Sequence, residues 1–186
     1  SFSPREIPKT ILNGFLRCLN LGYDFELVII GRQGFNLLQK ISWININKKI
    51  KNNKKIIFTD FVSSEERDAW LNSADCFVLL RPPCKETYHL FPTRLPEYFC
   101  TGKPVIITAV EPFTDFYKHK KEVYFIPKKN SSKDLANGFI ELFKNPSLRK
   151  FIGNTGKEYS RKNYSLIFLG TKISNFLKKI RNKDIT

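Results

Sequence analysis

One segment, Phe91 to Ile106, carries residues whose types and spacing suit a phosphorylated ligand. Thr93 stands where it can cap a helix, and Pro96 is tolerated in the first turn of that helix. Backbone N–H groups at the helix start, together with the helix dipole and the Arg94 guanidinium, could hold a diphosphate. Glu97, about a turn further on, could accept hydrogen bonds from two vicinal hydroxyls, as carboxylates do with a ribose. The alternative is a helix with a favourable first-turn acid and an exposed arginine.

The bulk composition indicates a globular protein with one large domain. The chain has 186 residues, of which 41% are hydrophobic and 14% aromatic, enough to build a core. Its net charge of +15 attracts polyanions: nucleic acid, an anionic membrane surface or phosphorylated small molecules. Lysine clusters such as 48–55 and 118–121 are typical of solvated loops and helix ends. Charge alone therefore does not select a partner.

The cysteines and histidines indicate no metal site. The four cysteines, Cys18, Cys76, Cys84 and Cys100, form no CxxC pair and have no histidine at metal-ligand spacing. We expect reduced thiols in a cytoplasmic protein, without metal or other cofactor. The longest apolar stretches are too short to span a bilayer, and no signal peptide is visible. The absence of methionine suggests a fragment or missing residues.

Helices and strands alternate along the predicted chain. Strands are predicted over 25–30, 55–59, 76–80, 104–108 and 123–126. Helices are predicted over 9–22, 36–51, 63–74, 93–101, 132–144, 147–162 and 166–180. Ser63 and Glu66 have the spacing of a capping box at the start of one helix. This order predicts a single α/β domain over 1–186, with a parallel sheet covered by helices on both faces. Ligands bind such sheets beyond the carboxyl ends of the strands.

The sequence FPTRLPEYFCTGKPVI at 91–106 resembles the hallmark segment of family 4 glycosyltransferases, the group 1 glycosyl transferases. The resemblance extends upstream to the strand and glycine at 25–31, to IFTDFV at 57–62 and to NSADCFVL at 72–79. Downstream, 134–153 resembles the helices that close the domain, so coverage runs over roughly 9–160. The resemblance implies the Rossmann-like C-terminal half of a two-domain GT-B enzyme, which binds a nucleotide-diphosphate sugar.

The resemblance implies donor-binding roles for residues in three loops and one helix. They are Gly31, Arg32, Gly34, Phe61, Val62, Pro92, Thr93, Arg94, Leu95 and Glu97. Glu97 would bind the ribose hydroxyls, and Thr93 and Arg94 would lie at the diphosphate. The glycines would let the chain pass close to the donor, and the loop at 61–62 would contact the base chiefly through backbone atoms.

Catalytic roles are implied for two cations near the N-terminus and for one residue that would reach the transferred sugar. Arg5 and Lys9 resemble the basic residues before the family's first helix, which stabilise the departing diphosphate without a metal. The family's first glutamate stands eight residues before the second, and here that position is His89. Glu86 lies three residues further back. Either Glu86 or His89 reaches the sugar, or the chain belongs to a branch that lacks the first glutamate.

Two other functions are compatible with parts of the pattern. One is a nucleotide-sugar epimerase of similar architecture, which would be expected to use more catalytic histidines and acids than this chain carries. The other is a basic nucleic-acid-binding module, but no helix-turn-helix, zinc-finger or RNA-recognition signature is present. The resemblance instead implies a hexosyl-type transferase of bacterial surface glycans or lipid-linked sugars, with no nucleic-acid partner and with the fragment alone inactive.

The C-terminal stretch has an amphipathic pattern. Leu166, Ile173 and Phe176 are among the apolar residues that share one helical face, while lysines and Arg181 lie elsewhere. Helices from about residue 146 are expected to pack on this domain or on a missing N-terminal acceptor domain. The alternative is peripheral contact with an anionic membrane, at the inner face of a bacterial membrane.

Overall fold

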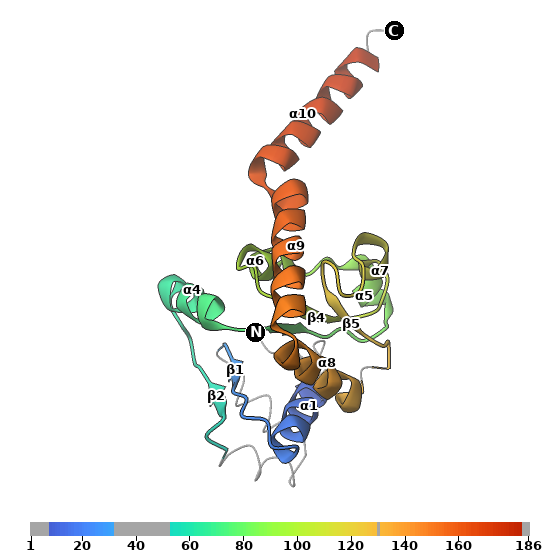
Figure 1. Cartoon of the computed structure of the whole chain (residues 1–186). Coiled ribbons are helices and arrows are strands. Elements are labelled where there is room, and N and C mark those ends of the chain that lie inside the picture. Colours follow the sequence, from blue (N-terminus) through green and yellow to red (C-terminus); the bar gives the residue numbers. More distant parts are fainter. Residues whose placement is uncertain (1–7, 32–52, 130, 184–186) are drawn as a thin grey trace.

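The computed structural model describes residues 8–31, 53–129 and 131–183 of the chain (Figure 1). The predicted helix over 36–51 lies outside these residues. So do three of the predicted site residues, Arg5, Arg32 and Gly34.

The described elements follow the predicted order. The strands are β1 (Leu27–Ile29), β2 (Ile56–Phe58), β3 (Phe77–Leu79), β4 (Val105–Thr108) and β5 (Tyr124–Ile126). The helices are α1 (Pro8–Asn20), α4 (Ser64–Ser73), α5 (Lys85–His89), α6 (Arg94–Cys100), α7 (Phe113–Phe116), α8 (Ser132–Lys144), α9 (Pro146–Tyr164) and α10 (Leu166–Lys183). The short helices α5 and α7 were not predicted, because each occupies a segment read as a loop.

All the described strands pair in parallel, as predicted, but they form two hydrogen-bonded groups. β1 pairs with β2, and β3, β4 and β5 form a three-stranded sheet with β4 in the centre. Parallel pairing requires a crossover between successive strands, and α6 supplies it between β3 and β4.

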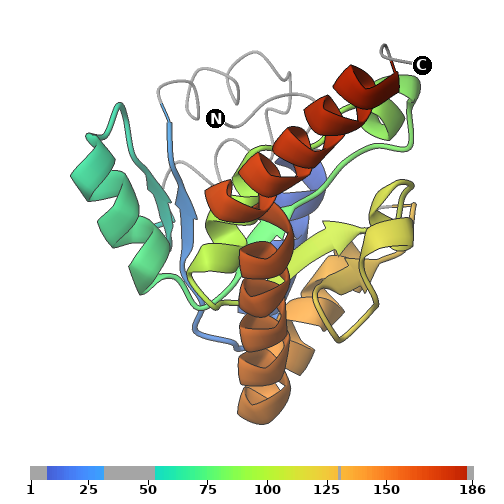
Figure 2. The same cartoon turned by 90° about the horizontal axis from the view of Figure 1, so that it is seen from above.

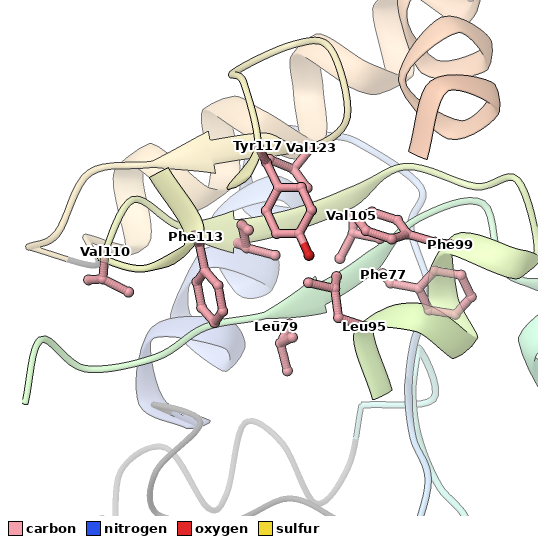
Figure 3. Close-up of a cluster of buried hydrophobic side chains, with 10 residues drawn as sticks. Phe77, Leu79, Leu95, Phe99, Val105, Val110, Phe113, Tyr117 and Val123 are labelled. Atoms are coloured by element: carbon pink, nitrogen blue, oxygen red, sulfur yellow. The ribbon is translucent and has the colours of Figure 1, made fainter. Parts of the chain in front are cut away.

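The three-stranded sheet is buried on both faces. On β4, Val105 and Ile107 belong to one hydrophobic cluster, whereas Ile106 belongs to another. Successive strand residues point to opposite faces, so the continuous apolar run of this strand contributes side chains to two cores. Figure 3 shows the first core, where Phe99 and Phe113 from α6 and α7 lie over the sheet. The second core contains residues of α1, α8 and α9.

Helix α1 joins the two groups of strands. Ile11 packs in the second core of the three-stranded sheet, while Leu12 and Phe15 pack against Ile29 and Ile56 of the β1–β2 pair. Helix α8 lies along α1 in both views (Figures 1 and 2). Both strand groups are therefore attached to one common helix layer.

Helices α9 and α10 differ although they are consecutive. In α9, Ile152 and Gly153 are buried against the domain. In α10 the apolar residues are exposed, Leu166 by 88% and Phe176 by 63%, and the helix extends away from the rest of the structure in Figure 1. Within the residues that the structure describes, no helix has the length and apolar character needed to cross a membrane.

Helix α4 is well capped but weakly packed. The predicted capping box is confirmed: the Glu66 N–H donates to Ser63 Oγ at 3.1 Å, and the Ser63 N–H donates to Glu66 Oε2 at 2.8 Å. No residue of α4 is buried, and the expected apolar face consists of Trp70 and Leu71, both half-buried. The helix is thus held more by its cap than by its packing.

Candidate functional site

Helix α6 directs Glu97 outward. Leu95 and Phe99 lie one helical turn apart and are almost completely buried in the first core. Glu97 stands midway between them, so its side chain projects from the opposite side of the helix and is exposed. Tyr98 stacks on Phe77 of β3 with ring centroids 4.3 Å apart. The carboxylate is therefore presented to solvent from a helix that is fixed on two sides.

The start of α6 corrects one prediction. The Thr93 side chain makes no capping hydrogen bond, and its backbone is helical rather than extended, so Thr93 is not a side-chain cap. Instead the Leu95 N–H donates to the Pro92 carbonyl oxygen at 3.0 Å, which closes the first turn. The Leu95 side chain lies in the core and cannot touch a ligand. Thr93 is exposed and Arg94 half-buried at the same end of the helix.

Helix α5 carries the two candidates for the missing first glutamate. Glu86 and His89 are both exposed, while Thr87 between them is buried. The Cys84 Sγ and Thr87 Oγ1 atoms lie 3.3 Å apart in a hydrogen bond, and the Leu90 N–H donates to the Glu86 carbonyl oxygen at 3.1 Å. Both side chains are therefore accessible to solvent on this short helix.

The loop that contains α5 is fixed at the carboxyl end of the sheet. The Arg81 N–H, just after β3, donates to Thr108 Oγ1 at the end of β4, at 3.0 Å. Thr108 itself is fully buried. The chain from Arg81 to Thr93 therefore leaves from the edge where ligands bind parallel sheets.

The β1–β2 pair supplies the second set of donor-binding candidates. Gly31 follows β1 with a φ of 132°, a region that favours glycine, and its N–H donates to Thr59 Oγ1 at 3.4 Å. Phe61 follows β2 and is 82% exposed, and Val62 is half-buried. Gly31 and the loop after β2 thus lie at the same ends of two paired strands.

Lys9 lies in the first turn of α1 and is exposed, away from the buried face formed by Ile11 and Leu12. Within residues 8–31, 53–129 and 131–183, no group of three or more His, Cys, Asp or Glu side chains is arranged to hold a metal ion.

All four cysteines have free thiols, and the pKa values of two of these thiols are strongly raised. Burial raises the pKa of Cys76 to about 12 and that of Cys18 to about 11. Both are therefore protonated at neutral pH and cannot act as thiolate nucleophiles.

His119 is exposed but held in place. Its Nδ1 accepts a hydrogen bond from the Phe125 N–H at 3.0 Å, and desolvation lowers its pKa, with Lys120 nearby adding to the shift. On the same side of β5, Glu141 of α8 accepts hydrogen bonds from Lys120 Nζ at 2.5 Å and from the Tyr124 hydroxyl at 2.7 Å. This polar group ties the segment before β5 and the first residue of the strand to α8, so it stabilises the fold.

Residues 2–159 match the family described as glycosyl transferases group 1. The chain belongs to that family. The match includes every predicted donor-binding and catalytic residue, from Arg5 to Glu97. No curated protein matches the chain.

Solved structures show the same fold at low sequence identity. HepE of Anabaena, in complex with UDP-glucose, superposes with a TM-score of 0.75 at 13% identity, covering 96% of this chain and 46% of HepE. The C-terminal domain of the group 1 glycosyl transferase LpcC from Francisella tularensis gives 0.71 at 19% identity, covering 89% and 83%. A glycosyltransferase from Rickettsia africae gives 0.76 at 15% identity, covering 96% and 45%. The chain has the fold of a GT-B C-terminal domain and spans about half the length of the complete relatives.

Proposed function

We propose that this domain binds a nucleotide-diphosphate sugar as the donor for glycosyl transfer. The observation that carries the proposal is the exposed carboxylate of Glu97 on α6, inside the family's hallmark segment. A carboxylate accepts hydrogen bonds from two vicinal hydroxyls without needing a partner cation. Because Leu95 and Phe99 fix the helix, the backbone that carries the carboxylate is held in place before the ligand arrives.

The basic residues around the proposed donor site carry positive charge that would bind the diphosphate of the donor. Arg94 lies three residues before Glu97, so a ribose and a pyrophosphate can be held side by side. Lys9, with Arg5, supplies further positive charge for the departing nucleoside diphosphate. In this mechanism fixed cations neutralise the leaving group, and no metal ion is required. Glu86 or His89 on α5 contacts the transferred sugar.

Uridine diphosphate sugars are the first donors to test. HepE was solved with UDP-glucose and with UDP, and a mutant of the Staphylococcus aureus protein TarM was solved with UDP. We propose that the donor of the present chain also carries uracil as its base. Gly31, Phe61 and Val62 would form the base side of the site.

A thermal-shift panel of UDP, GDP, ADP and their common sugars tests the donor site. We expect one nucleoside diphosphate to raise the melting temperature selectively, since a ligand that binds only the folded state stabilises it. A panel of oligonucleotides serves as the comparison for the basic surface. Stabilisation by oligonucleotides alone, with a steep dependence on salt, would instead support a nucleic-acid-binding module.

The acceptor site is proposed to lie in another domain of a longer polypeptide, because the chain spans about half of its complete relatives. The exposed apolar face of α10 is proposed to pack against that domain. The acceptor is proposed to be a bacterial surface glycan or lipid-linked sugar, handled in the cytoplasm at the inner face of the membrane. Sedimentation with anionic and with neutral liposomes tests direct membrane contact: binding that requires anionic lipid would assign α10 to the membrane instead.

A further inference from the structure

The last turn of α9 contacts the segment that leads into α6. The ring of Tyr164, the final residue of α9, packs on the ring of Phe91 with centroids 5.4 Å apart. Phe91 stands two residues before Thr93 and three before Arg94. Tyr164 therefore touches the chain just ahead of the residues proposed to meet the diphosphate, although it is about 70 residues away in sequence.

Tyr164 is itself firmly held. Its hydroxyl forms a hydrogen bond of 2.6 Å with the hydroxyl of Tyr117, and its ring lies 5.9 Å from that of Tyr159. Tyr117 is buried, and its ring meets that of Phe99 in α6 at 5.5 Å. Burial raises the pKa of Tyr164 to about 12, so the hydroxyl stays neutral. One group of tyrosines thus contacts α6 on its inner side and Phe91 ahead of its start.

The segment between α5 and α6 has a backbone hydrogen bond on either side of Phe91. The Leu90 N–H donates to the Glu86 carbonyl oxygen, and the Leu95 N–H donates to the Pro92 carbonyl oxygen. These bonds close the end of α5 and the start of α6. Between these two hydrogen bonds, the aromatic contact with Tyr164 holds Phe91 in place. This contact therefore sets the direction in which the chain enters α6.

We propose that Tyr164 is a positioning residue that holds the segment 91–94 in its donor-binding conformation. This inference rests on the proposed function and extends it to a residue outside the family match, which ends at residue 159. A segment that is already ordered binds more tightly, because less conformational entropy is lost when the ligand arrives. Loss of the ring at 164 frees the segment and weakens donor binding without removing any ligand contact.

The test measures the affinity of the whole chain for the nucleoside diphosphate that stabilises it, together with amide hydrogen exchange of 88–96 in the free protein. Tyr164→Ala is expected to bind about three- to tenfold more weakly, the range that a lost aromatic pair gives. Exchange over 90–94 is expected to become faster. Tyr164→Phe keeps the ring and is expected to restore both values to nearly those of the wild type. Phe151→Ala, at an exposed ring on the same helix, is the matched control and is expected to change neither.

Phe91→Ala examines the same contact from its exposed side, so the proposal stays testable if Tyr164→Ala does not fold. It is expected to match Tyr164→Ala, and the double variant is expected to bind no more weakly than either single one. Additive losses, or a Phe91→Ala chain with wild-type affinity and exchange, would overturn the role of Tyr164. The wild-type titration reports on the donor site by itself: no binding by the wild type would refute the proposed function, whatever the exchange data show.

Discussion

The two groups of strands are built from similar apolar runs but differ in how they are covered. Every residue of β4 is buried, and helices cover both faces of the sheet that it centres. In the β1–β2 pair, Ile29 and Ile56 are buried under α1, but Val28 and Ile57 are only half-buried. Nearby α4 contributes no buried residue. The difference in burial therefore comes from the helices that cover the strands and not from the strand sequences.

The residues of the proposed donor site come from both halves of the domain, which differ in how firmly they are packed. Glu97 and Arg94 lie on α6, which is fixed in the doubly covered half. Gly31 and the exposed Phe61 follow the thinly covered strands. We infer that the doubly covered half holds the sugar-phosphate part of the donor rigidly, while the other half adapts to the base.

The largest expected effect is in the core under α6. Phe99→Ala removes a ring that is 1% exposed and should lower the free energy of unfolding by about 3–5 kcal/mol. Phe58→Ala, at the half-buried end of β2, is the matched variant and should cost about half as much. Urea denaturation followed by circular dichroism measures both. Equal losses would contradict the difference in coverage.

A smaller effect is expected where α9 meets the turn after α6. A Cβ atom at Gly153 would lie 2.0 Å from the Gly102 carbonyl oxygen, so Gly153→Ala forces the two backbones apart. Overpacking of this kind costs about 1–3 kcal/mol, visible as a lower melting temperature. Gly170→Ala in α10 has open space around the new methyl group and should be neutral or slightly stabilising. A Gly153→Ala chain as stable as Gly170→Ala would show that the close packing of α9 is not required.

Helix α4 should lose order locally when its cap is removed. Ser63→Ala deletes the capping acceptor and should cost the helix about 1 kcal/mol. Because α4 buries no residue, we expect faster amide exchange over 64–73 with little change in the global melting temperature. Ser64→Ala, one residue further on, is the control. A global loss of stability after Ser63→Ala would mean that α4 is coupled to the core after all.

The smallest effect concerns the ion pair beside β5. Hydrogen bonds from Lys120 and Tyr124 lower the pKa of Glu141. A carboxyl whose folded pKa is lowered contributes stability above its unfolded pKa and loses it as the pH falls through the folded value. Since both side chains of the pair are more than a third exposed, Glu141→Gln should cost only about 0.5 kcal/mol at pH 7. The difference in the free energy of unfolding between the wild type and Glu141→Gln, measured by urea denaturation, should shrink as the pH falls below the ordinary pKa of a glutamate, about 4.3. A difference that grows there would contradict the assignment.

Much of the architecture could be predicted from the sequence. The apolar run ending at Thr108 and the Ser63–Glu66 spacing each correspond to a structural feature. These are local signals, in which the residues that form the element also encode it. The division of the strands into two groups was not predictable, because it depends on pairing between distant segments.

The candidate site was predicted in part. The position of Glu97 follows from the helical spacing of Leu95 and Phe99, and it is exposed as a ligand-binding carboxylate must be. The capping role of Thr93 was wrong, because the Pro92 carbonyl oxygen and the Leu95 N–H close the turn without the side chain. The contact between Phe91 and Tyr164 has no local signal at all, since it joins segments that lie far apart in the sequence.

Isothermal titration calorimetry of the preferred nucleoside diphosphate, with the wild type and with Glu97→Gln, shows whether Glu97 binds the donor. We predict that Glu97→Gln reduces the affinity at least about tenfold, the loss of a charged hydrogen-bond acceptor. Glu65→Gln, which changes an exposed carboxylate in the first turn of α4, should bind like the wild type. Equal affinity of the wild type and a folded Glu97→Gln chain would contradict the account.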